Sequence, residues 1–158
     1  MKSITLFLLL AMILSTLTGC AQETLTAIEE TKNKVTYATG VLSEAAPLAT
    51  AYVGLNNLYL NPLSYTDGNW KTEFDKHDDT IEGSYERLKT LQPTQEFSEM
   101  HELLLSTLDQ TIKINDVTEK TIEVGGKMTG DITKQFETSY ESFRNISSRL
   151  EELKNIKE

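Results

Sequence analysis

The chain has 158 residues and carries 24 acidic and 15 basic side chains, which gives a formal net charge of −9. We expect no nucleic-acid partner, because an acidic surface repels a polyanion. The length suits a single domain, and the only cysteine excludes both an internal disulfide and a cysteine-based metal site.

The first nineteen residues have the parts of an export signal. A basic start at Met1-Lys2 is followed by an apolar run from Ile4 to Leu14. That run is shorter than the roughly 20 residues that a helix needs to cross a bilayer. We therefore interpret it as a processed segment and not as a permanent membrane span.

The tetrapeptide Leu17-Thr18-Gly19-Cys20 resembles the lipobox of bacterial lipoproteins, where an aliphatic and two small residues precede a lipidated cysteine. The resemblance implies cleavage after Gly19 and a diacylglyceryl group on Cys20, whose two acyl chains hold a protein stably at a membrane. We therefore expect a signal peptide at 1–19, a lipidated tether at 20–23 and one helical domain at 24–158. An ordinary secretory signal with an unused thiol is the alternative.

Downstream of the tether, apolar residues recur every three or four positions, which is helical periodicity. A first helix is predicted over 24–42, and Ser43 to Pro47 is interpreted as a helix stop and a new start, since proline fits a first turn but not a helix interior. A second, shorter helix then runs from Pro47 to about Leu60. Turn residues follow between Asn61 and Asn69.

The clearest heptad predicts a third helix that Pro93 ends. Its members are Trp70, Phe74, His77, Ile81, Ser84, Leu88 and Leu91. A fourth helix starts at Thr94-Gln95-Glu96 and carries two apolar stripes, which predicts packing between two neighbouring helices. These stripes are Phe97, Leu104, Leu108, Ile112 and Ile122, and Met100, Leu103, Ile114, Val117 and Val124.

Glycines at 125, 126 and 130 predict a turn before a fifth helix, whose heptad continues almost to the end of the chain. Its members are Ile132, Phe136, Ser139, Phe143, Ile146, Leu150 and Leu153. Short connections favour antiparallel neighbours. We therefore predict an all-α fold, an antiparallel bundle of four to five helices in which the last three form an up-down-up core.

The two histidines, His77 and His101, do not match a carboxylate-type metal centre. Such centres use Glu-x-x-His on two helices, and here Phe74 and Ser98 occupy the glutamate positions. Structural or surface roles are expected for both histidines. The acidic run Asp75, Asp78, Asp79 and Glu82 is interpreted as a solvated helix face, because it lacks a calcium-loop pattern. No metal or cofactor is expected.

Asn115 and four threonines (Thr107, Thr111, Thr118 and Thr121) place polar groups among the apolar stripes of the fourth helix. A single buried asparagine commonly sets helix register and partner. A polar patch in a ligand pocket between helices is the alternative. Trp70, Phe74 and Tyr85 are expected in the core.

Catalytic motifs are absent from the sequence. The thiol of Cys20 is assigned to lipid, no Gly-x-Ser-x-Gly elbow occurs, and Lys127-Met128 follows Gly125-Gly126 where a phosphate loop needs another spacing. We therefore do not expect an enzyme.

After Cys20, an acidic helix and the segments Tyr37-Ala38, Ser43–Ala49, Leu91–Pro93 and Met100-His101 resemble the small helical lipoproteins of Bacillus-type Gram-positive bacteria. The resemblance implies the outer face of the cell membrane and contributes no functional residues. The expected function is a lipid-anchored binding or scaffold lipoprotein that contacts another envelope protein. The alternatives are a small-ligand or metal-binding lipoprotein and a plain structural or exclusion factor of the envelope.

Overall fold

The computed structural model describes the backbone of residues 2–61 and 67–154, and the side chains of residues 27–61, 67–150, 153 and 154. Its helices are α1 (Lys2–Leu60), α2 (Gly68–Lys89), α3 (Ser98–Glu123) and α4 (Gly130–Lys154), with a short 3-10 helix η2 (Gln95–Phe97) before α3. The described residues therefore form an all-α bundle of four helices, which confirms the predicted fold class.

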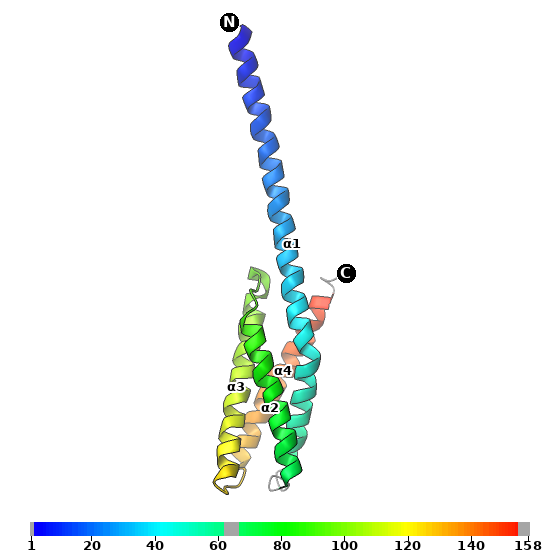
Figure 1. Ribbon diagram of the computed structural model, residues 1–158, viewed down its shortest axis with the longest axis vertical. Coiled ribbons are helices and arrows are strands. Elements are labelled where there is room, and N and C mark those ends of the chain that lie inside the picture. The colour runs from blue at the N-terminus through cyan, green and yellow to red at the C-terminus, as the bar shows by residue number, and fades with distance from the viewer. Residues whose placement is uncertain (1, 62–66, 155–158) are drawn as a thin grey trace.

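The four helices pack in a ring that follows chain order. Helix α1 contacts α2 and α4, while α3 contacts α2 and α4 from the other side. Each helix runs antiparallel to the next, and the N-terminal part of α1 extends beyond the ends of the other three (Figure 1). The predicted three-helix core is therefore incomplete, because α1 is an equal fourth member of it. Among the described residues, no helix has an apolar stretch that meets the requirement for crossing a bilayer.

The predicted helix break between Ser43 and Pro47 is wrong, because α1 passes through both residues without interruption. Val41, Leu48 and Tyr52 are buried on both sides of the proline, and their spacing follows one continuous helical stripe. A break would rotate one half of this stripe out of the core. Pro47 itself is exposed, so its ring takes no place in the core. Packing of the stripe outweighs the cost of about 3 kcal/mol for an interior proline.

Aromatic side chains of α1 form the centre of the core. Tyr37, Tyr52 and Tyr59 are each at most 1% exposed. The ring of Tyr52 stacks on Phe143 and that of Tyr59 on Phe136, with centroid separations of 4.1 Å in both cases. Offset aromatic pairs of this kind add about 0.5–1.5 kcal/mol beyond the burial of their surface. These stacks join α1 to α4.

The predicted heptad of the last helix is confirmed in full. All seven of its members are buried, namely Ile132, Phe136, Ser139, Phe143, Ile146, Leu150 and Leu153. The heptad of α2 is confirmed at Trp70, Phe74, Ile81, Ser84 and Leu88. The two-stripe prediction for α3 is only partly right: Met100, Leu104, Leu108 and Ile114 are buried, but Leu103, Val117 and Val124 are exposed. Helix α3 still packs between two neighbours, and polar residues fill the rest of its inner face.

The predicted turns lie at helix ends. Asp67 caps α2, because its carboxylate accepts a hydrogen bond from the Asn69 N–H at 3.0 Å. Gly125 follows α3 with a φ of 70°, a left-handed conformation that glycine adopts without the steric cost of a Cβ. The local chemistry at Asp67 and at Gly125 therefore agrees with the predicted turns, while residues 62–66 of the first turn lie outside the described residues.

Candidate functional site

The residues predicted to direct lipidation lie at the start of α1. Leu17, Thr18, Gly19 and Cys20 fall within the helical backbone of α1, but their side chains lie outside the described residues. The same holds for the expected signal peptide (1–19) and tether (20–23). The lipid anchor on Cys20 therefore stays a prediction from the sequence.

A buried polar seam, which we define as Thr107, Thr111, Asn115 and Thr118 of α3, runs along the interior of the bundle. The hydroxyl of Thr111 lies 2.7 Å from the hydroxyl of Tyr52 on α1 and 2.6 Å from that of Ser139 on α4. One side chain thus links three helices. Because a shift by one residue along any of them would leave buried hydroxyls unpaired, this contact fixes their relative register.

Asn115 forms the second link of the polar seam. Its side-chain oxygen accepts a hydrogen bond from the Tyr59 hydroxyl at 2.9 Å, and its amide nitrogen donates to Asp78 of α2 at 2.6 Å. The asparagine is fully buried. Its side chain is hydrogen-bonded to α1 and α2 at once, which supports the role of Asn115 in setting helix register over its role in a ligand pocket. Thr121, which the sequence grouped with it, is half-buried and donates only to the Val117 carbonyl of its own helix.

The buried tyrosines have pKa values far above neutral. Burial raises the pKa of Tyr37 and of Tyr52 to about 12. Burial also raises the pKa of Tyr59 well above its usual value of 10.0, with a smaller contribution from the charge of Asp78. All three hydroxyls therefore stay protonated at neutral pH and act as hydrogen-bonding groups rather than as acids.

Asp78 is the carboxylate with an unusual titration. Burial raises its pKa to about 6, and the negative charges of Glu82, Asp116 and Glu119 add to the effect, while the hydrogen bond from Asn115 opposes it. A carboxylic acid that titrates near 6 changes charge within the physiological range. The sequence predicted a solvated helix face here, which is correct for the exposed Asp79 and Glu82 but wrong for Asp78.

Two other carboxylates on α2 and α3 are paired with one lysine. Asp75 pairs with Lys71 at 2.8 Å, and Lys71 also pairs with Glu119 of α3 at 2.8 Å. Among the described residues, no group of three or more histidine, cysteine, aspartate or glutamate side chains has the arrangement of a metal site.

The two histidines are packing residues in separate parts of the bundle. His101 lies edge-on to Tyr37, with 3.3 Å between its Nδ1 and the tyrosine hydroxyl. His77 covers the backbone of α1 at Gly54, where no side chain intervenes. Burial is the main cause that lowers the pKa of both histidines below 6.5, so both are neutral at neutral pH. This agrees with the structural roles predicted for them.

Glu44 is the single charged residue between Lys34 and Asp67, and it points into the bundle. Its carboxylate accepts two hydrogen bonds from the Arg87 guanidinium, at 2.7 and 2.8 Å, and a third from Ser84 at 2.8 Å. The hydrogen bond from Arg87 is the main cause that lowers the pKa of Glu44. The pair joins α1 to α2 and leaves the rest of this stretch of α1 without charge.

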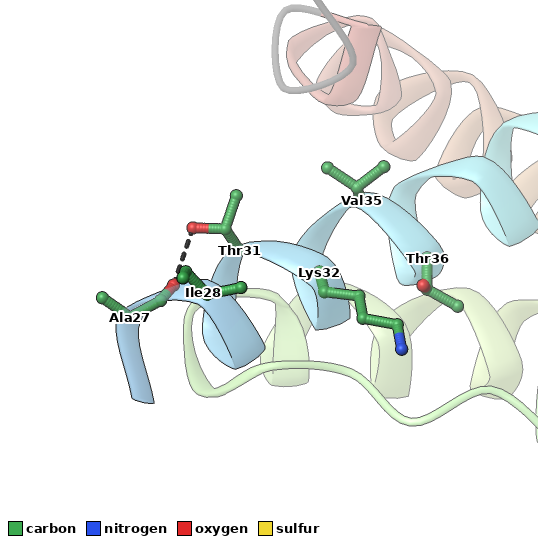
Figure 2. A pocket seen from close by; sticks show the side chains of 6 residues that line it. All are labelled: Ala27, Ile28, Thr31, Lys32, Val35 and Thr36. Atoms are coloured by element: carbon green, nitrogen blue, oxygen red, sulfur yellow. Dashed lines mark hydrogen bonds between the residues drawn. The ribbon is translucent and has the colours of Figure 1, made fainter. Parts of the chain in front are cut away.

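Two hollows of the described structure lie at its surface. One of about 520 Å³ is lined by six side chains between Ala27 and Thr36, all from α1, as Figure 2 shows. A groove of about 480 Å³ lies between α1 and α2 and is lined by polar residues that include Asn57, Asn61 and His77. Between α2 and α3 the cavity measures only about 10 Å³, about the room that one water molecule needs. At this interface, one of those where the sequence analysis allowed a ligand pocket, the described cavity is therefore too small for a metabolite.

One exposed surface differs from the rest, and we call it the α1 outer face. It consists of the exposed residues of α1 from Thr36 to Leu60, and every one of them is uncharged. The members are Thr36, Thr39, Ser43, Ala46, Pro47, Ala49, Thr50, Val53, Asn57 and Leu60. On each of α2, α3 and α4, more than half of the exposed residues with described side chains are charged. The run of uncharged residues is visible in the sequence, but its outward direction is not.

No protein-family model matches this chain, and comparisons with curated proteins and with solved structures also found no match. The resemblance to small Gram-positive lipoproteins therefore stays a prediction that depends on the residues quoted for it.

Proposed function

We propose that this protein is a lipid-anchored lipoprotein on the outer side of a bacterial cell membrane, where it acts by binding another protein of the envelope. The tetrapeptide Leu17-Thr18-Gly19-Cys20 carries the anchoring part of the proposal. The closed interior supports the binding part, because the polar seam is occupied by its own hydrogen bonds. A partner protein would then contact the surface of the bundle.

The chemistry of the described side chains also favours binding over catalysis. The tyrosine hydroxyls remain protonated at neutral pH, and the two histidines lie in separate contacts with aromatic or backbone partners. Catalytic acids, bases and nucleophiles need convergent geometry around a substrate position. The two histidines, which lie in separate parts of the bundle, do not converge on one such position.

A small-ligand function is the second candidate, and the groove between α1 and α2 favours it. Its wall includes the amides of Asn57, Asn61 and Asn69 and the carboxylates of Asp67 and Glu73. These groups suit a small polar ligand that is neutral or cationic. The groove lies at a different helix interface from the one that the sequence indicated.

A cross-linking pull-down from intact cells tests the proposal. The native chain is compared with Cys20→Ala, which cannot receive lipid and which leaves the bundle residues unchanged. We expect one specific envelope protein to be recovered with the native chain and to be depleted with Cys20→Ala. Equal recovery from both versions would contradict a role that depends on the anchor.

A melting experiment on this protein in vitro distinguishes the two candidate functions. A ligand in the groove stabilises the folded state in proportion to the logarithm of its concentration, so a melting shift is expected at concentrations above the dissociation constant. A panel of cationic and neutral metabolites is therefore screened against the native chain and against Asn57→Asp. A shift that the substitution changes would favour the groove, whereas no shift across the panel favours protein binding.

A further inference from the structure

The charge of this protein is distributed unevenly around the bundle. Acidic residues outnumber basic ones by nine. Among the described helix residues, exposed charges lie on α2, α3, α4 and the part of α1 before Thr36 (Glu29, Glu30 and Lys32), but not on the α1 outer face. A contact between two copies through α2, α3 or α4 would remove exposed charged side chains from water, which is unfavourable. The α1 outer face is the one helix surface of the described bundle where two copies meet without that cost.

We propose that the α1 outer face pairs with the same face of a second copy of this chain, with the two α1 helices side by side and parallel. Two-fold pairing needs one self-complementary patch. The small residues Ala46 and Ala49 allow two helices to approach closely. Val53 and Leu60 are one heptad apart and are 50% and 65% exposed, so they supply the large apolar side chains that such a seam buries.

The parallel direction follows from the position of the proposed anchor, so the inference depends on lipidation of Cys20. Helix α1 is continuous from Lys2 to Leu60, which places Cys20 on the N-terminal side of the α1 outer face in every copy. Parallel helices bring both anchors to the same end of the pair. An antiparallel pair would place them at opposite ends, where they cannot enter one membrane leaflet.

The size of the face predicts a weak pair. From Thr36 to Leu60 the helix rises by about 36 Å, and a strip about 10 Å wide then covers roughly 360 Å² on each copy. Stable interfaces bury about 800 Å² per partner. The chain should therefore be monomeric in dilute solution and should pair where anchoring raises its local concentration.

A lipid surface is a less favourable binding partner than a second copy for the α1 outer face. Helices that lie on membranes combine large apolar residues with lysine or arginine at their borders. The α1 outer face has two large apolar residues and no basic residue, and the net charge of the protein opposes contact with anionic lipid.

Disulfide cross-linking in membranes tests the pair. Thr50→Cys places a thiol in the middle of the α1 outer face, and in the lipidated chain it is the only free thiol, because the natural chain has one cysteine. Mild oxidation of isolated membranes should yield a dimer of this chain. Ser106→Cys, which is exposed on α3, serves as the control and should remain monomeric.

Two end reporters, Thr39→Cys and Asn57→Cys, determine the direction of pairing. In the parallel pair each forms dimers on its own. In an antiparallel pair residue 39 meets residue 57, so only a mixture of the two variants would cross-link, and that result would overturn the proposed arrangement.

A charge introduced into the face gives the sharpest contrast. Val53→Glu places two carboxylates against each other in the pair and should lower the Thr50→Cys dimer yield about tenfold or more. Val117→Glu on α3 is the matched control, because Val117 is 52% exposed where Val53 is 50% exposed, and it should leave the yield unchanged. An equal yield from both variants refutes the proposal, as does a Thr50→Cys product that contains a different protein.

The anchor and the pair have separate readouts in the same membranes. Mass spectrometry of the N-terminal peptide reports lipid on Cys20. Lipid without a Thr50→Cys dimer refutes the pair alone. Without lipid, Cys20 is a second free thiol, so a dimer then counts for the contact only if the Ser106→Cys control stays monomeric. That result would refute the anchor, and with it the argument for local concentration, while the contact itself stands.

Discussion

The raised pKa of Asp78 makes a quantitative prediction about stability. A folded-state pKa of about 6 against an ordinary value of 3.8 means that the folded protein binds this proton more tightly than the unfolded chain. Stability from this group is complete below pH 3.8 and is lost as the pH rises through 6. Replacement by a neutral isostere, Asp78→Asn, should therefore stabilise the protein at pH 7.5.

The magnitude follows from the shift and from the partial exposure of the side chain. A shift of about 2 units corresponds to about 3 kcal/mol. Because Asp78 is only partly buried, solvent screening reduces this figure, and we expect a gain of about 1 kcal/mol. The hydrogen bond from the Asn115 amide, now 2.6 Å long, is retained because an asparagine at position 78 still offers a carbonyl oxygen.

Urea denaturation at pH 5.0 and pH 7.5 measures the effect. Urea is chosen because it is uncharged and leaves charge interactions unscreened. The expected gain in stability at pH 7.5 corresponds to a rise in melting temperature of roughly 3 °C for a domain of this size. Asp79→Asn is the control, because it removes the same charge from the neighbouring, exposed position. The reasoning is refuted if both variants are equally stable at pH 7.5, or if the advantage of Asp78→Asn is as large at pH 5.0.

Three further predictions concern backbone positions in the helices. Gly54→Ala should destabilise the protein by about 1–3 kcal/mol, because the added Cβ would overlap the His77 ring. The double variant Gly54→Ala with His77→Ala should recover most of this loss of stability, measured in the same urea titration. Gly83→Ala, whose Cβ would meet only the end of a flexible arginine side chain, should instead stabilise by about 0.5–1 kcal/mol, and equal effects at both glycines would contradict the packing argument. Pro47→Ala should stabilise the protein by about 1–3 kcal/mol, since it restores a backbone N–H inside α1 without changing a buried side chain. Thermal melting measures this change. A loss of stability would show that the proline ring contributes to the fold.

Different parts of α1 have different structural or proposed functional roles. Its proposed anchor precedes the bundle, its inner face supplies the stacked tyrosines of the core, and its outer face remains uncharged. Glu44 is compatible with this arrangement because Arg87 binds it from α2 at 2.7 Å. A single helix thereby connects the proposed membrane attachment with the proposed pairing surface.

Much of the fold was predictable from local sequence patterns. Among the described side chains of α4, the heptad from Ile132 to Leu153 predicted every buried position, including the polar Ser139. One apolar stripe on a long helix has only one way to face a core. The turn at Gly125 was predictable as well, since a left-handed conformation after a helix favours glycine. The tetrapeptide that ends at Cys20 is likewise a local signature that needs no tertiary structure to be identified.

Other features depend on contacts between residues that are distant in the chain. Helix α1 continues through Pro47 because buried residues on both sides share one stripe, and a propensity rule that considers only the proline misses this packing. The titration of Asp78 depends on its burial and on Asn115, 37 positions further along the chain. The sequence alone shows that charge is scarce between Lys34 and Asp67. Only the packing of α1 between α2 and α4 decides that Glu44 points inward, which leaves an uncharged surface facing outward. The physical reason is that the burial of a side chain depends on the neighbours that it acquires on folding.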